Sequence, residues 1–125
     1  MKMIQQISVN DKFDALVQLL NEAYLTVADE FGLTKENCAT NNAFITAEEL
    51  KSQLTDNREF FSFVLDRKAI GFIAIEKSVR VAGTYYIEKV AVHPNFRHNG
   101  IGVKLMSFAT DRIKHLGGSK ISIGV

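Results

Sequence analysis

The fold is decided by one stretch of sequence, residues 84–102, which reads TYYIEKVAVHPNFRHNGIG. Residues 84–92 are rich in β-branched and aromatic side chains, which indicates a strand. The strand must end at His93-Pro94, because proline lacks a backbone donor and disfavours helix in the residue before it. After a short connection, apolar residues recur at helical spacing from Ile101 to Leu116, until Gly117 and Gly118 break the pattern. The stretch therefore predicts a strand, a turn and the start of a helix.

Two helices are predicted before this stretch. Apolar residues from Phe13 to Val27 fall on one helical face, with Asp11 in front as a possible N-cap and Gly32 as a natural stop. A polar loop follows, and residues 46–49 then read Thr-Ala-Glu-Glu, the form of a capping box. The second helix is predicted to be short.

Two apolar segments, residues 60–65 and 70–75, flank the polar break Asp66-Arg67-Lys68 and predict a central antiparallel hairpin. Residues 120–125 predict a last strand. The expected order is strand, two helices, three strands, helix, strand, an α/β fold with a mixed sheet in one domain, residues 1–125. The final strand-helix-strand unit predicts a parallel pair.

Composition excludes several classes of protein. The chain has 15 Lys and Arg against 14 Asp and Glu, a net charge of +1, so it carries no electrostatic footprint for nucleic acid. Its longest apolar stretch, Ala69 to Ile75, is too short to cross a bilayer, and the N-terminus does not resemble a signal peptide. We therefore expect a cytoplasmic protein with no membrane partner. Cys38 is the lone cysteine, without a metal-ligand cluster beside it, so we expect a structural or incidental thiol and no metal site.

The turn before the last helix has the features of a phosphate site. Gly100 and Gly102 remove Cβ atoms where a phosphate would approach, and the helix N-terminus offers amides and a positive dipole end. Arg97 adds a forked cation. The spacing fits neither the P-loop nor the dinucleotide fingerprint. Taken alone, these residues leave a second interpretation open, a glycine-rich loop that only turns the chain into the helix.

The whole stretch resembles the acetyl-CoA-binding motif of the GNAT superfamily of N-acetyltransferases. That motif is Gln/Arg-x-x-Gly-x-Gly/Ala after a strand ending in Val-His-Pro, and Arg97, Gly100 and Gly102 fill it. The order of elements along the chain is also similar to that of the family. The resemblance implies a GNAT-like acyl-CoA N-acyltransferase fold.

The resemblance also implies a cofactor and a reaction. Acetyl-CoA would be the acyl donor, and its acetyl group would pass directly to a primary amine. The pantetheine arm would lie between the fourth and fifth strands, with strand amides polarising the thioester carbonyl. The residues implied are Val90, Ala91 and Val92 for pantetheine, and Arg97, His98, Asn99, Gly100, Ile101 and Gly102 for the pyrophosphate.

Transfer to an amine requires a base, because an amine with a lysine-like pKa of about 10.4 is protonated near neutral pH. Glu88 is the candidate, on the expectation that strand alternation places it on the same face as Val90 and Val92. The alternative is a solvent-facing or ion-paired carboxylate. His93 is a weaker base candidate, and Tyr86 is expected to pack or to contact the acceptor. We expect His98 at the rim of the site and His115 to be solvated.

One part of the family pattern is missing. Members usually continue after the fifth strand with another helix and a strand pair, and this sequence ends at Val125. We therefore expect an exposed last strand that supports self-association, for example as a homodimer. A non-catalytic acyl-CoA-binding or interaction module is the alternative function. Residues 28–44 are expected to cover the acceptor side of the site. The sequence does not identify the acceptor.

Overall fold

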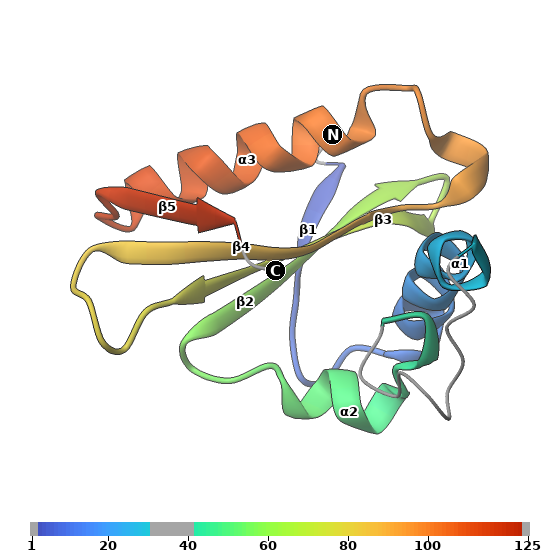
Figure 1. Ribbon diagram of the computed structural model, residues 1–125, viewed down its shortest axis with the longest axis horizontal. Coiled ribbons are helices and arrows are strands. Elements are labelled where there is room, and N and C mark those ends of the chain that lie inside the picture. Colours follow the sequence, from blue (N-terminus) through green and yellow to red (C-terminus); the bar gives the residue numbers. More distant parts are fainter. Residues whose placement is uncertain (1–2, 31–41, 124–125) are drawn as a thin grey trace.

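The computed structural model describes residues 3–30 and 42–123, with only the backbone for residues 26–30. The chain forms a five-stranded sheet with helices on both faces (Figure 1). Its elements in chain order are β1 (Ile4–Ile7), α1 (Asp14–Glu30), the 3-10 turn η1 (Asn42–Phe44), α2 (Ala47–Ser52), β2 (Arg58–Leu65), β3 (Lys68–Lys77), β4 (Thr84–Val92), the 3-10 turn η2 (Pro94–Phe96), α3 (Ile101–His115) and β5 (Lys120–Ile123).

The strands lie in the order in which they occur in the chain, β1-β2-β3-β4-β5. The first four pair antiparallel, and β5 pairs parallel to β4 after the crossover through α3. The predicted order, the central hairpin, the parallel last pair and the mixed α/β class are all confirmed. None of the helices in the described part of the chain is long and apolar enough to cross a membrane.

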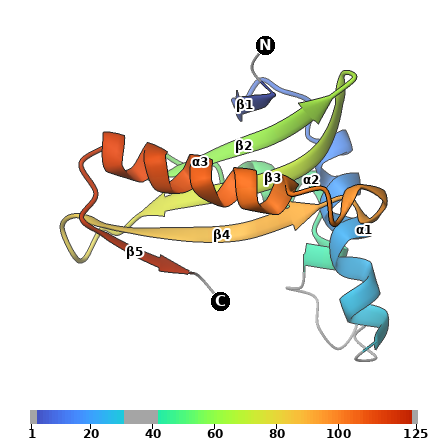
Figure 2. The same ribbon diagram turned by 90° about the horizontal axis from the view of Figure 1, so that it is seen from above.

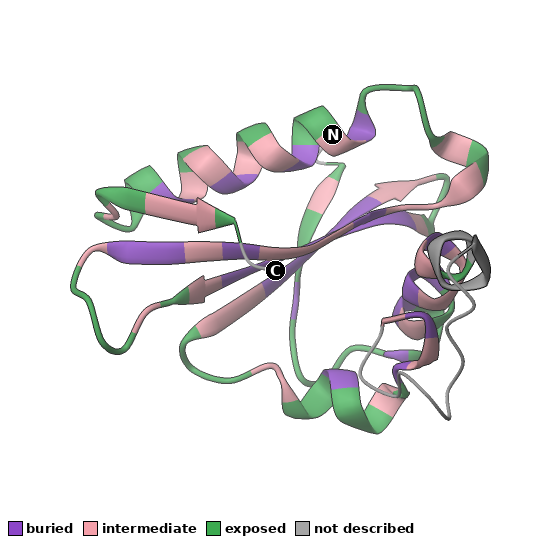
Figure 3. Cartoon of the chain, in the orientation of Figure 1, coloured by how far each residue is buried: buried purple, intermediate pink, exposed green. Residues whose placement is uncertain are grey.

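Each face of the sheet has its own hydrophobic layer. On one face, β-strand residues such as Phe60 and Phe72 pack against α1 and α2. On the other, residues such as Ile73 and Ile87 pack under Leu105 and its neighbours on α3. The buried side chains accordingly concentrate along the sheet and the inward sides of the helices (Figure 3). The two layers hold β4 between α1 and α3.

Local sequence signals explain some helix boundaries and not others. The capping box at the start of α2 is confirmed, since Glu49 N donates to the Thr46 hydroxyl at 3.2 Å and Thr46 N donates to the Glu49 carboxylate at 3.2 Å. The expected N-cap role of Asp11 is wrong. Its carboxylate accepts from Ser8 N at 2.7 Å in the turn before the helix, and α1 begins at Asp14. The predicted stop at Gly32 and the lone Cys38 lie outside the described residues.

A β-bulge interrupts β4 beside β3. Ala74 pairs with Glu88 but Phe72 pairs with Ala91, so β4 has one extra residue between these pairs. Lys89 takes a positive φ of 56° there, an uncommon conformation for a residue with a side chain. The bulge shifts the alternation, so Val90 and Val92 pack with Ile87 on the α3 side. The expectation that Glu88 shares their face is therefore wrong, because strand alternation does not continue through a bulge.

Leu105 tests the α3 layer. It is 0% exposed, whereas Val103 on the same helix is 73% exposed. We expect Leu105→Ala to lower the free energy of unfolding by about 2–5 kcal/mol, because it removes buried methyl groups and leaves a cavity. Val103→Ala is the matched control and should change it by less than about 0.5 kcal/mol. Urea unfolding of both variants checks this, and equal losses would contradict the packing described for α3.

Candidate functional site

The C-terminal half of β4 lacks a partner strand on one side. β5 pairs only with residues 84–87, so among the described residues nothing continues the ladder opposite residues 88–92. Figure 2 shows β5 diverging from β4 along its length. Unpaired strand edges present backbone donors and acceptors that a ligand can use. The opening contains the predicted residues Val90, Ala91 and Val92.

The turn after β4 delivers the chain to an open helix N-terminus. Gly100 precedes α3 with φ 74°, a left-handed conformation that glycine adopts without strain. The first bond within the helix runs from Lys104 N to Gly100 O at 3.0 Å, so the amides before Lys104 have no partner within α3. His98, also at positive φ (69°), and Asn99 are exposed at the rim. Ile101 can contribute only its backbone, because its side chain is buried under α3.

Gly102 is a glycine that the protein's own packing does not require. It has no positive φ, and a Cβ built there would meet only Val92 Cγ2, at 3.9 Å. A hollow of about 270 Å³ opens at this point, lined by residues including Val92, Arg97, Gly100 and Gly102. A glycine inside a helix lowers stability by up to about 1 kcal/mol relative to alanine. The presence of Gly102 is therefore better explained by the space that it leaves for a ligand than by the packing of the protein.

Two side chains of this turn contact α1. Arg97 Nη2 donates to the backbone carbonyl of Ala23 at 2.6 Å. His93 Nε2 lies 2.7 Å from the Glu22 carboxylate, while His93 Nδ1 accepts from Asn95 N at 3.1 Å. Both ring nitrogens of His93 thus have partners, which argues against its role as the base. Arg97 lines the hollow and also holds the turn against α1.

A tyrosine joins α1 to the open half of β4. Tyr24 donates its hydroxyl to the carbonyl of Val90 at 3.1 Å. Burial raises the pKa of Tyr24, and a hydrogen bond with the Asn42 side chain opposes the rise. The phenol is therefore protonated at neutral pH and can keep donating. This contact occupies the carbonyl of Val90, one of the three residues whose backbone the family resemblance assigns to the pantetheine arm.

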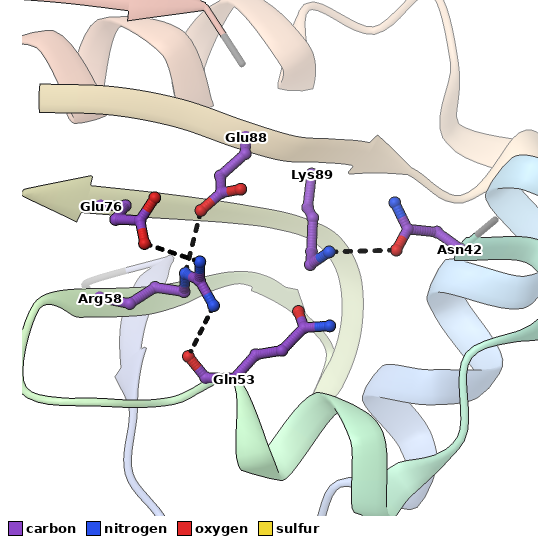
Figure 4. A network of polar contacts seen from close by, with 6 residues as sticks. All are labelled: Asn42, Gln53, Arg58, Glu76, Glu88 and Lys89. Atoms are coloured by element: carbon purple, nitrogen blue, oxygen red, sulfur yellow. Dashed lines mark hydrogen bonds and ion pairs between the residues drawn. The ribbon is translucent and has the colours of Figure 1, made fainter. Parts of the chain in front are cut away.

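Glu88 lies in a polar cluster on the α1 and α2 face of the sheet (Figure 4). Arg58 from β2 is at its centre. Its Nη2 contacts Glu76 at 2.8 Å, its Nε is 3.0 Å from Glu88 Oε1, and its Nη1 donates to the Gln53 carbonyl at 3.0 Å. The ion-paired alternative for Glu88 is therefore the arrangement observed.

The pairing of Glu88 is incomplete. The Arg58 Nε and Glu88 Oε1 atoms are close but not aligned as a hydrogen bond, and neither has another hydrogen-bond partner in the described structure. Gln53 Oε1 is likewise buried without a partner among these residues. Buried acceptors are almost always satisfied in folded proteins, so these two oxygens are exceptions within this cluster.

Residues 13–125 match the sequence profile of the acetyltransferase (GNAT) family. The chain belongs to this family. Among solved structures, it is similar to a PaiA N-acetyltransferase from Thermoplasma acidophilum in complex with coenzyme A, at 20% identity and a TM-score of 0.73, over 98% of this chain and 77% of that chain. It is also similar to the ribosomal-protein-S18-alanine N-acetyltransferase of Escherichia coli, at 16% identity and a TM-score of 0.73, over 100% and 67% of the two chains.

A third similar structure is an aminoglycoside 6'-N-acetyltransferase complexed with coenzyme A, at 18% identity and a TM-score of 0.69. The chain covers 62% of that protein's length, and 99% of its own. At these identities the likeness shows a shared fold. No curated protein matches the chain in sequence.

The GNAT motif did not reveal the side chains around Glu88. Arg58, Gln53 and Asn42 come from three other elements, and none of them belongs to a recognisable pattern. One signal was available for Lys89, because two adjacent charged residues, Glu88 and Lys89, break the apolar alternation of a central strand. Tyr86 is half-buried on the face of Glu88 and pairs with Glu76 in register, and His115 is exposed as expected.

Other features of the GNAT domain lie away from this site. Another hollow, of about 1060 Å³, lies between β1 and α3, and Phe61 and Phe108 are among its lining residues. It does not include the turn before α3. In the part of the chain that is described, no three His, Cys, Asp or Glu side chains gather to hold a metal ion.

Gly102 gives a prediction about the GNAT domain without ligand. Gly102→Ala should raise the free energy of unfolding by up to about 1 kcal/mol, because alanine favours helix and has open space there. Gly118→Ala is the contrasting variant, since its Cβ would lie 2.5 Å from Ile113 Cγ2 and should destabilise the protein. Thermal unfolding measures both. A destabilising Gly102→Ala would show that the fold itself requires this glycine.

Proposed function

We propose that this GNAT protein transfers an acetyl group from acetyl-CoA directly to a primary amine. The observation that carries the proposal is Gly102, a helix glycine with open space beside it that no contact of the protein explains. It lies where the open edge of β4 meets the free amides of α3. The similar structures with bound coenzyme A, both named N-acetyltransferases, support the choice of donor and of an amine acceptor.

The chain's residues fit the phosphate part of the donor. A helix N-terminus binds an anion through its amides and its positive dipole end. Here the turn from Arg97 to Gly102 adds a guanidinium and a hollow without side chains at its centre. In this proposal, Arg97 keeps one nitrogen on Ala23 and offers its remaining donors to phosphate, since guanidinium has five N–H groups.

Acetyl-CoA supplies an activated acyl group as a thioester. The amides of residues 90–92 are proposed to hold and polarise its carbonyl, a role of the oxyanion-hole kind. The edge that faces away from β3 is open for this, while Tyr24 fixes the Val90 carbonyl and so the orientation of the strand.

Glu88 is the proposed base. In this proposal Glu88 accepts a proton from the arriving amine, and its Oε1 has no aligned hydrogen bond that would have to be broken. Arg58 keeps the carboxylate in place, and Glu76 shares the positive charge of Arg58. Because two carboxylates share one guanidinium, Arg58 compensates the charge of Glu88 only in part, which favours a cationic amine.

Three broader expectations stay predictions. The structure describes a single chain and does not test self-association through β5. The cytoplasmic location and the roofing role of residues 28–44 are also untested, and residues 31–41 lie outside the described part of the chain.

Donor binding can be tested without knowing the acceptor. Acetyl-CoA at a hundredfold excess over Kd should stabilise the wild-type protein by about 2.7 kcal/mol. Gly102→Val should lose most of this gain, because its side chain would fill the hollow. Gly100→Val is a poorer choice, since it also strains a positive φ. Ser107→Val places the same side chain on an exposed part of α3 and is the control. Thermal shift with acetyl-CoA is measured for the wild type, Gly102→Val and Ser107→Val. An undiminished shift in Gly102→Val would falsify the donor site.

The base can be tested with any amine that the protein acetylates, found by thiol release over an amine panel. Glu88→Gln should lower kcat by about 10²–10⁴-fold at pH 7, with recovery at higher pH as the acceptor deprotonates by itself. Glu76→Gln removes the other carboxylate of Arg58 and is the matched control, with a smaller effect expected. Near-normal turnover of Glu88→Gln at pH 7 would transfer the role to water.

A further inference from the structure

Lys89 is a charged residue of the described site that has no role in the reaction proposed so far. It lies at the bulge of β4, directly before residues 90–92, with a positive φ of 56°. A backbone conformation of this kind costs free energy and is most often kept at functional positions. Its side chain extends to the α1 side of the sheet, where Nζ donates to Asn42 Oδ1 at 3.3 Å (Figure 4).

The partners of Lys89 are unusual for a half-buried lysine. Among the described residues no carboxylate lies within ion-pair distance of Nζ, and its partner is a neutral amide. Glu88, its neighbour in the chain, is paired with Arg58. In the described part of the chain, Lys89 is therefore a half-buried amine held by one hydrogen bond to a neutral acceptor.

The surroundings lower the pKa of this amine. Burial lowers the pKa of Lys89, Glu88 raises it, and Arg58 lowers it again. Among the described residues, the elements that pack here also carry the titratable groups Glu76 on β3, Tyr24 and Glu22 on α1, and Tyr86 on β4 itself. A desolvated lysine with a lowered pKa is a nucleophile, because more of it carries a free electron pair at a given pH.

We propose that Lys89 is itself an acceptor, and that the protein acetylates its own Lys89 Nζ when no outside amine occupies the site. This inference rests on the proposed function, which brings the thioester to the strand segment that follows Lys89. A lysine has a flexible four-carbon stem, so Nζ can leave Asn42 and turn to the open edge of β4. The nitrogen forms a bond to the acetyl carbon, the carbon-sulfur bond breaks, and the nitrogen's proton leaves with the thiolate as CoA–SH.

The first test is incubation of the purified protein with acetyl-CoA, followed by peptide mass spectrometry. We expect Lys89 to acquire one acetyl group faster than exposed lysines such as Lys51 and Lys114, with a rate that saturates in acetyl-CoA and falls when CoA competes. Lys89→Arg keeps the charge and should lose this acetyl group while retaining the thermal shift with acetyl-CoA. Lys89 modified no faster than the exposed lysines would overturn the proposal.

A matched variant tests the chemical reason. Asn42→Asp places a carboxylate at the neutral partner of Nζ, which should raise the pKa of Lys89 and slow its acetylation by about tenfold or more at pH 7. Trace labelling with acetic anhydride, without CoA, gives a second readout. The reactivity of Lys89 should level off at a lower pH than that of Lys51 or Lys114 in the wild type, and at a higher pH in Asn42→Asp. Identical profiles for all three lysines would contradict a nucleophilic Lys89.

The two proposals fail separately. If acetyl-CoA shifts the melting temperature and Lys89 stays unmodified, self-acetylation is wrong and donor binding stands. If acetyl-CoA gives neither a shift nor a CoA-sensitive modification, the proposed function is wrong and the inference falls with it.

Discussion

The extra residue in β4 is the constraint on which the site depends. A regular strand would alternate its side chains between α1 and α3 along its whole length. The bulge instead places Glu88 and Lys89 in succession on the α1 side and returns Val90 to the α3 core. One inserted residue therefore brings two charged groups to the edge of the segment that β5 leaves open.

The two cations near the bulge, Arg58 and Lys89, have different kinds of partner. Arg58 has two carboxylates, while Lys89 has a neutral amide as its partner. If Glu88 paired with Lys89 instead, the lysine would be held as an ammonium and the carboxylate would be saturated by its own neighbour. Because Arg58 pairs with Glu88, the cluster keeps both a carboxylate with an unaligned oxygen and an amine whose pKa burial lowers.

The sequence predicted the framework of this protein well, because its signals there are local. The capping box at Thr46 and the proline after His93 fix element ends through contacts only a few residues apart. The turn from Arg97 to Gly102 is likewise a continuous motif. What the sequence did not predict depends on contacts between distant residues, such as Arg58 with Glu88, or on the bulge, whose extra residue is defined by the partner strand.

This difference between local contacts and contacts of distant residues also distinguishes the two halves of the site. The proposed phosphate half consists of backbone amides, a glycine that leaves space, and a helix dipole, all of which lie within one short stretch of chain. The proposed reaction half consists of side chains from α1, η1, β2, β3 and β4, which meet because two hydrophobic layers pack these elements together. A substitution in either layer could shift β4 by a fraction of the distance between neighbouring strands. Such a shift would leave the turn from Arg97 to Gly102 intact, but it would move Glu88 and Lys89 away from the open edge. Donor binding and acetyl transfer are therefore separable properties of this fold, and the second depends more on the packing of α1 and α3 against β4.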